Sequence, residues 1–381
     1  MTDWKSSLRS DPMPWLLENG CAAIRYRTLV ELLDLPRDHP DVQAAKHEMQ
    51  DYGPALKLEK SQRKDGTWGG RIHASDPKKF ETCTENGILQ LFEYGWNRDQ
   101  KAVRLAAKVL RQYLTQKKDV PMFEFAKIVK ADERRETYYR WFLRNLALGL
   151  LVRAGYEEEK NRTAVMELLD ACAGFVDDPI SRNPTEEIGA SHPLIRFEAW
   201  KRGYVFFPDL YALRVFAWSP WLLRGEMAKM RLKKLFDYVL SEPYQRLAPE
   251  LGLIRTAKGA FTRGGGLRVR SIDHYEKHGN IDELLVALEL LARLGLVNRY
   301  PVLIGHMEWL QSQQAKDGRW NLSTKLWNDG SLWSQLLRVE KDWRSPVRKE
   351  ADMTFRVLLI LKNQWERQMS MLDRREDGYP F

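Results

Sequence analysis

Apolar residues in this chain gather in segments whose spacing is typical of helices. The clearest lies at 281–294, "IDELLVALELLARL", where apolar side chains cover nearly the whole circumference of a helix. A helix that is apolar almost all round is a buried helix. Comparable dense segments occur at about 22–35, 81–95, 137–154, 209–218 and 350–362. The pattern therefore predicts six buried helices.

A more amphipathic segment follows these buried helices after a short break. In 101–114 one face carries Ala, Leu, Val and Tyr, while Lys and Arg occupy the opposite face. Glycines 95, 155 and 295 stand where a helix end favours a left-handed residue. The chain is therefore predicted to consist of six pairs, each with an inner and an outer helix.

Strand signals are weak throughout, so the expected fold class is all-α. Buried helices that alternate with half-exposed ones can close into a ring, with the inner helices lining a barrel and the outer helices covering it. This gives an (α/α)6 toroid, and it makes one domain of residues 1–381. The main alternative is an open solenoid, which needs polar capping ends. The sixth pair is as apolar as the third, which favours the ring.

The connections from each outer helix to the next inner helix are long. In a closed ring they would all lie on one rim, which also receives the positive N-terminal ends of the inner helices. Long loops that are rich in aromatic residues tend to be ordered and functional. We therefore expect the ligand in the mouth of the barrel, at the rim formed by 63–80, 115–136, 177–208, 241–280 and 315–349.

A heptapeptide occurs twice, as "QRKDGTW" at 62–68 and as "QAKDGRW" at 314–320. The Gln can hydrogen-bond to helix ends or loop backbone, Asp-Gly favours a tight turn, and the Trp can pack across the Gln amide. These units are expected to tie neighbouring helix pairs together, a structural role.

The longer stretch "MEWLQSQQAKDGRW" at 307–320 resembles the QW repeat of squalene and oxidosqualene cyclases, in which an aromatic-Leu pair precedes a Gln and then Gly-x-Trp. The stretch "LKLEKSQRKDGTW" is a weaker version. Protein prenyltransferase β subunits have a related repeat and the same toroid. The resemblance covers two short motifs and the six-pair pattern, and it implies the toroidal fold of this superfamily.

The chain does not have the catalytic motifs of that superfamily at the positions where its chemistry requires them. Class II cyclases protonate their substrate with the middle Asp of a D-x-D-D motif, whereas the nearest string in this chain is "VDDP" at 176–179. The Asp-x-Cys of a prenyltransferase zinc site has its letters at 170–172, inside the third outer helix. We therefore expect neither a metal nor another cofactor.

Acidic residues recur where inner helices begin. Most are expected to cap the helices and to compensate their dipoles. Those that turn into an apolar cavity would have a raised pKa and could act as a general acid or stabilise a carbocation. His274 could serve as an acid or base at the rim, but its i, i+4 spacing to His278 lacks the Glu of a zinc-protease motif. The candidate catalytic residues are Asp209, Asp282, Asp352, Glu85 and His274.

Two further features are candidates for binding a ligand. The segment 262–280, "TRGGGLRVRSIDHYEKHGN", combines glycine backbone with arginines, as a diphosphate or carboxylate site requires, although a flexible solvated loop is the simpler interpretation and the favoured one. Aromatic residues cluster around the third and fourth inner helices and could shape an apolar or cationic guest. The candidate ligand-binding residues are Arg263, Gly265, Arg268, Arg270, Tyr139, Trp141, Trp200 and Tyr211.

Charge and composition narrow the class of partner. The chain has 61 basic and 52 acidic residues, for a net charge of +9, but the arginines are scattered and form no basic stripe, so a nucleic-acid partner is not expected. Three cysteines without metal spacing favour a reducing cytoplasm. We expect no secretory signal and no integral membrane segment, while peripheral membrane contact stays open.

The sequence thus favours a central pocket that binds or transforms a small apolar or amphiphilic molecule with an anionic head, of isoprenoid or lipid type. An enzyme of this kind would use cyclase- or lyase-type acid–base chemistry without a nucleotide cofactor. One alternative is a carbohydrate-active α/α toroid, either a polysaccharide lyase or an unsaturated-glycoside hydrolase. Another is a non-catalytic interaction scaffold whose ring is filled by its own side chains.

Overall fold

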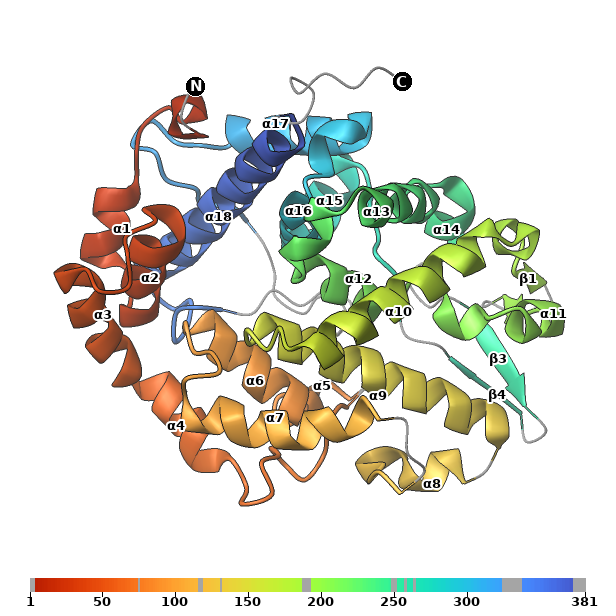
Figure 1. Ribbon diagram of the computed structural model, residues 1–381. Helices are drawn as coiled ribbons and strands as arrows, with labels where there is room; N and C mark the ends of the chain where they lie inside the picture. Colours follow the sequence, from red (N-terminus) through yellow and green to blue (C-terminus); the bar gives the residue numbers. More distant parts are fainter. Residues whose placement is uncertain are drawn as a thin grey trace. The chain divides into compact units, whose positions relative to one another are not determined.

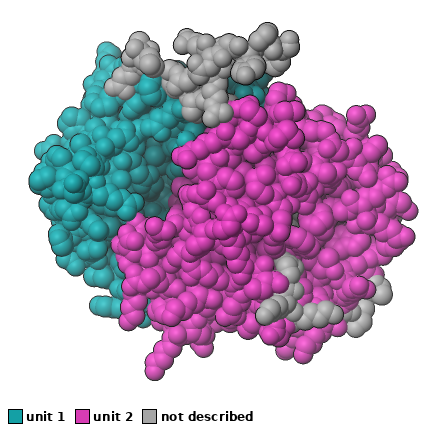
Figure 2. Space-filling model, in the orientation of Figure 1, with its two compact units in different colours: residues 1–61, 89–96, 270–381 teal, residues 62–88, 97–269 magenta. Residues whose placement is uncertain are grey.

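The computed structural model describes residues 4–74, 76–115, 119–130, 132–186, 193–247, 252–256, 259–262, 265–323 and 338–372. Of these residues, 66% are helical and 4% are in strands, which confirms the predicted helical class (Figure 1). The chain divides into two compact units, which Figure 2 colours separately. Unit 1 comprises residues 1–61, 89–96 and 270–381, and unit 2 comprises residues 62–88 and 97–269.

The secondary structure of unit 1, over its described residues, is helical. Its helices are η1 (Trp4–Ser7), α1 (Met13–Asn19), α2 (Ala22–Arg27), the π-helical η2 (Thr28–Leu32), α3 (Pro40–Gln50), α4 (Gly53–Ser61), α15 (Ile272–His278), α16 (Ile281–Arg293), η7 (Val297–Arg299), α17 (Pro301–Ser312) and α18 (Pro346–Leu372). The C-terminal half of α6 (Thr84–Glu93) also belongs to this unit, and its N-terminal half belongs to unit 2.

Unit 2 combines helices with a small sheet. Its further helices are α5 (Pro77–Phe80), α7 (Lys101–Tyr113), η3 (Phe123–Phe125), α8 (Ala126–Val129), α9 (Glu133–Arg153), α10 (Glu159–Asp177), η4 (Pro179–Arg182), α11 (Phe197–Lys201), η5 (Tyr204–Phe206), α12 (Leu210–Ala217), η6 (Pro220–Arg224), α13 (Glu226–Val239) and α14 (Glu242–Leu247). Its strands are β1 (Thr185–Glu186), β2 (Leu194–Ile195), β3 (Leu253–Thr256) and β4 (Gly259–Thr262), in the spatial order β1-β2-β3-β4.

The predicted buried helices are present. They correspond to α2 with η2, and to α6, α9, α12, α16 and α18. The amphipathic partners α7, α10, α13 and α17 follow four of them. Gly95, Gly155 and Gly295 have φ angles of 81°, 89° and 66°, so each ends its helix in the left-handed conformation that the sequence predicted. Within unit 2, α9 packs against α12, and within unit 1, α16 packs against α18.

Three features differ from the expected pattern. Helix α18 is a long helix over Pro346–Leu372, and the structure describes no partner helix after it. The long connections contain short helices and strands, because their aromatic and apolar residues can be buried only if the backbone is hydrogen-bonded. Strands β3 and β4 form an antiparallel hairpin that the weak strand signal did not reveal. Closure of the helix pairs into one ring stays a prediction.

The two heptapeptides have the same local geometry. Gln62 Nε2 donates to the carbonyls of Gly66 and Ala102, at 3.0 and 2.9 Å. In the second copy Gln314 Nε2 donates to the carbonyls of Gly318 and Ser10, at 2.8 and 3.0 Å. Both turn glycines are left-handed, with φ of 85° and 89°.

The Trp of each heptapeptide is buried and connected to the next inner helix. Trp68 N donates to Thr84 Oγ1 at the start of α6, and Trp320 N donates to Thr354 Oγ1 in α18, both at 3.0 Å. The structural role predicted for these motifs is therefore confirmed. Among the residues that the structure describes, no helix combines the length and apolarity needed to cross a membrane.

Candidate functional site

A buried acid–base cluster lies in unit 2. Nδ1 of His73, in the loop before α5, is 2.7 Å from Oε2 of Glu85 in the first turn of α6. The hydroxyl of Tyr211, from α12, donates to the same carboxylate oxygen at 3.3 Å. Arg214, one turn further along α12, places its guanidinium 3.8 Å from the other oxygen of Glu85. Side chains from two chain segments, the loop before α5 and α12, thus converge on the carboxylate that α6 supplies.

This His73–Glu85–Tyr211 cluster is shielded from solvent, with 2%, 2% and 4% of the three residues exposed. Aromatic rings surround the imidazole of His73. The distances between its ring centroid and those of Phe80, Phe125 and Phe142 are 6.0, 6.4 and 5.1 Å. The Phe125 ring is stacked on the imidazole at an interplanar angle of 10°. Aromatic side chains therefore enclose the imidazole, one stacked on it and two at steep angles to it.

Burial raises the pKa of Tyr211 well above its ordinary value, and the neighbouring carboxylate of Glu85 adds to the effect. The phenol therefore keeps its proton and acts as a donor to Glu85. The contact of the cluster that suits acid–base chemistry is the one of 2.7 Å between His73 Nδ1 and Glu85 Oε2. Two side chains that share a transferable proton at hydrogen-bond distance are suited to general acid or base chemistry.

Glu124, in η3, contributes a second carboxylate to this region. Its two oxygens accept the backbone N–H groups of Ile72 at 3.0 Å and of His73 at 2.6 Å. Burial raises the pKa of Glu124, whereas the two backbone donors act in the opposite direction. The preceding residue, Phe123, has a φ of 41°. A left-handed Phe costs of order 1–3 kcal/mol, so the contacts of Glu124 and Phe125 hold η3 in a strained conformation.

Of the aromatic candidates, Tyr211 belongs to this cluster and Tyr139 is connected to it. Tyr139, on α9, stacks on Phe125 at 4.4 Å and on Phe261 of β4 at 5.8 Å. Trp141 packs edge-on against Phe206 at 4.7 Å and carries the guanidinium of Arg144 over its ring. Tyr139 and Tyr211 thus extend one continuous set of rings from β4 to His73.

Two predicted acids occupy positions at helix starts. Asp209 is the N-cap of α12, and its carboxylate accepts the backbone N–H of Ala212 at 2.9 Å. Asp282 lies in the first turn of α16 and is half-buried. Asp209 therefore has the capping role that the simpler interpretation gave to most of these acids.

The glycine- and arginine-rich segment is only partly described. Arg263 lies outside the described residues. The carbonyl of Gly265 accepts the backbone N–H of Leu210, at 3.1 Å, so this glycine ties the segment to the start of α12. Arg268 and Arg270 are half-buried, and the backbone N–H of Arg270 donates to the hydroxyl of Tyr275.

The two remaining candidates are Trp200 and His274. Trp200 is half-buried on α11. His274, on α15, lies with its ring centroid 4.3 Å from that of His278. Within the described part of the chain, no group of three or more His, Cys, Asp or Glu side chains could hold a metal ion.

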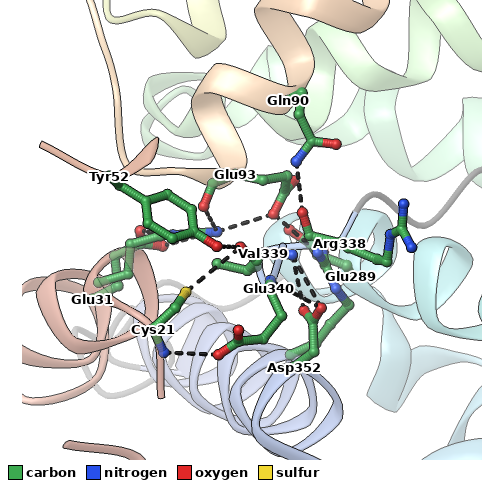
Figure 3. A network of polar contacts seen from close by, with 12 residues as sticks. Cys21, Glu31, Tyr52, Gln90, Glu93, Glu289, Arg338, Val339, Glu340 and Asp352 are labelled. Carbon is green, nitrogen blue, oxygen red and sulfur yellow. Dashed lines mark hydrogen bonds and ion pairs between the residues drawn. The ribbon is translucent and has the colours of Figure 1, made fainter. Parts of the chain in front are cut away.

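Asp352 belongs to a different network, in unit 1. Its carboxylate accepts the backbone N–H groups of Val339 and Glu340, at 3.1 and 3.2 Å, and the indole N–H of Trp343 at 2.7 Å. The carbonyl of Val339 in turn accepts from the Tyr52 hydroxyl at 3.3 Å. Figure 3 shows this backbone held between Asp352 and the side chains of Cys21 and Tyr52. Asp352 therefore fixes the segment that leads into α18.

Burial raises the pKa of Asp352, while Arg356 and the three N–H donors oppose that shift. Burial also raises the pKa of Glu340, whose Oε1 accepts the backbone N–H of Cys21 at 2.7 Å. The raised pKa that the sequence argument attached to a buried acid is thus found at Asp352. The three N–H donors around Asp352 indicate a structural role for its carboxylate, which holds the segment before α18 in place.

A chain of buried charges runs beside this segment. Arg27 Nη1 lies 3.0 Å from Glu93, Arg356 Nη2 lies 2.9 Å from the same carboxylate, and Arg356 Nη1 lies 2.7 Å from Glu289. Burial alone would lower the pKa of Arg356, but Glu93 and Glu289 raise it above its ordinary value. Buried charges need such partners, and removal of one partner is strongly destabilising.

His73 and Glu124 were not among the predicted site residues. His73 stands in "GRIHAS", which has no recognisable motif, and its partners are 12 to 138 residues away in the sequence. The usable signal was its position between the first heptapeptide and the acid Glu85 on the second inner helix.

Comparison of the chain with protein-family models, with curated proteins and with solved structures finds no match.

Proposed function

We propose that the protein is a terpenoid cyclase- or prenyltransferase-like (α/α)6 toroid that binds or transforms an apolar, isoprenoid- or lipid-like molecule with an anionic head. In this proposal His73 and Glu85 form the acid–base pair, and Tyr211 positions the carboxylate. The observation that carries the proposal is the buried contact of 2.7 Å between His73 and Glu85 inside a shell of aromatic rings.

The chemistry of the surroundings supports an apolar reactant. Phe80, Phe125 and Phe142 offer rings to a hydrocarbon, and the same rings stabilise positive charge. In an acid-initiated reaction the His73–Glu85 pair would transfer its proton to a carbon–carbon double bond, and the aromatic rings would stabilise the carbocation. Loss of a proton from the cation back to the pair would restore the acid. Atoms and charge balance without a cofactor.

The test is to incubate the purified protein with farnesyl diphosphate and with geranylgeranyl diphosphate and to analyse the products by gas chromatography and mass spectrometry. We expect cyclic or isomerised products from the wild type and a loss of at least about 100-fold in rate for Glu85→Gln, as is typical when a general acid is removed. Glu133→Gln, which removes an exposed carboxylate of α9, is the matched control. Unchanged turnover in Glu85→Gln would contradict the assignment.

A carbohydrate-active toroid is the second candidate. The convergence of Tyr211, His73 and Arg214 on Glu85 favours it, because a lyase uses such a set to abstract a proton next to a carboxylate. Incubation with uronate-containing polysaccharides would then give a product whose new double bond absorbs ultraviolet light.

A non-catalytic scaffold is the third candidate, and it is favoured by the bonding of these buried polar groups to one another. It predicts no turnover with either substrate class.

A further inference from the structure

Two adjacent backbone N–H groups in unit 2 hold a carboxylate. The N–H groups of Ile72 and His73 point at the two oxygens of Glu124, at 3.0 and 2.6 Å. Paired backbone donors of this kind bind carboxylate or phosphate groups in many proteins. Here the bound anion belongs to the chain itself, and it comes from η3, a single short turn.

We propose that the N–H groups of Ile72 and His73 are the receptor for the anionic head of the ligand, and that Glu124 occupies this receptor as an internal substitute. The inference rests on the proposed function, since it takes the apolar part of the ligand from there. The ligand class is an apolar tail that ends in a carboxylate or phosphate. Its head would displace Glu124, and its tail would meet the aromatic rings around His73.

The geometry links the receptor to the acid–base cluster. His73 contributes both its backbone N–H to the receptor and its ring atom Nδ1 to the acid–base pair. A ligand whose anionic head binds this N–H would therefore place its apolar tail next to the imidazole. Phe125 follows Glu124 directly and stacks on the His73 ring. Displacement of Glu124 would therefore also move the ring that covers His73. The left-handed backbone of Phe123, with a φ of 41°, makes release of η3 easier, because the strain is relieved.

The test is calorimetric titration of three probes: farnesyl diphosphate with head and tail, inorganic pyrophosphate as the head alone, and farnesol as the tail alone. The proteins are the wild type, Glu124→Gln and the control Glu133→Gln. Glu124→Gln keeps the size of the side chain but removes the competing charge. We expect it to bind farnesyl diphosphate and pyrophosphate about tenfold more tightly than the wild type and to bind farnesol equally well, because hydrogen bonds to a charged group are the stronger ones.

Equal or weaker binding of both anionic probes by Glu124→Gln would overturn the receptor. If farnesyl diphosphate and farnesol bind all three proteins with the same affinity, the receptor is wrong while the proposed function stands. If none of the probes binds any protein, both are wrong.

A measurement on the wild type covers the case in which Glu124→Gln does not fold. Hydrogen–deuterium exchange with saturating pyrophosphate should speed exchange of the amides of 123–125 and leave those of 72–73 protected. Unchanged exchange at 123–125 would contradict the receptor.

Discussion

His73 and Glu85 are joined by a contact of 2.7 Å between Nδ1 and Oε2, and both residues are 2% exposed. The contact connects the loop after the first heptapeptide to the first turn of α6. A buried pair of this kind is retained only if its polar atoms are satisfied within the protein. The pair therefore has consequences for stability that can be measured separately from any activity.

Replacement of Glu85 by Leu should destabilise the protein by about 2 kcal/mol, because the buried hydroxyl of Tyr211 and the His73 ring lose their carboxylate partner. The free energy of unfolding from chemical denaturation measures this loss. The matched control, Glu133→Leu on the exposed side of α9, should stay within about 0.5 kcal/mol of the wild type. A Glu85→Leu variant as stable as this control would show that the cluster is solvated.

Gly66→Ala should be destabilising by more than about 1 kcal/mol, because the residue has a φ of 85° and an added Cβ would lie 2.5 Å from the carbonyl oxygen of Leu105. Gly174, in α10, has nothing within 4 Å of an added Cβ. Gly174→Ala should therefore stabilise the protein by about 0.5–1 kcal/mol through its effect on helix propensity. Thermal denaturation of both variants measures whether Gly66→Ala lowers and Gly174→Ala raises the stability relative to the wild type. A Gly66→Ala variant as stable as the wild type would argue against the tight Asp-Gly turn.

Glu340 should make stability depend on pH. Burial and the charge of Asp352 raise its pKa in the folded state. A carboxyl whose folded-state pKa is raised stabilises the fold below its unfolded-state pKa, and that stabilisation is lost as the pH rises through the folded-state value. Glu340→Gln cannot ionise, so its stability relative to the wild type should improve between about pH 4 and about pH 7.

Urea denaturation at these two pH values measures the difference. The exposed carboxylate of Glu308, on α17, provides the control variant Glu308→Gln. A relative stability of Glu340→Gln that stays constant or decreases with pH would show that the Glu340 carboxyl is not held in a buried environment.

Arg356→Met should cost about 3–5 kcal/mol, because it leaves the buried carboxylates of Glu93 and Glu289 without the cation between them. Combining it with Glu93→Gln should cost less than the sum of the single changes, since the two residues are in contact. Arg299→Met, at an exposed position of η7, is the control. Additive costs in the double variant would mean that the Arg356–Glu93 contact contributes nothing.

The helical periodicity of the sequence predicted much of the fold. It located α7, α9, α12 and α16, and the glycines at 95, 155 and 295 end their helices as expected. These features follow from interactions between residues that are close in the sequence. The β3–β4 hairpin was missed, because "LIRT" and "GAFT" are too short for a clear alternation of apolar and polar residues.

The site was predicted less completely, for a physical reason. Glu85 and Tyr211 were named on the basis of helix position and residue type, but their contact depends on packing between α6 and α12. His73 lies in a loop and Glu124 in the short turn η3, and the course of both segments is fixed by distant contacts such as the bonds from Ile72 and His73 to Glu124. Asp352 was identified as a buried acid, but its three N–H donors come from a segment that carries no helical pattern.

The most direct test of the central claim is nuclear magnetic resonance of protein with isotopically labelled histidine rings, titrated with farnesyl diphosphate. The chain has seven histidines, and His73→Gln assigns the signal of His73. If the acid–base pair contacts the ligand, the ring signals of His73 should shift on binding while those of the exposed histidines stay unchanged. A His73 signal that does not move, while farnesyl diphosphate binds, would contradict the account.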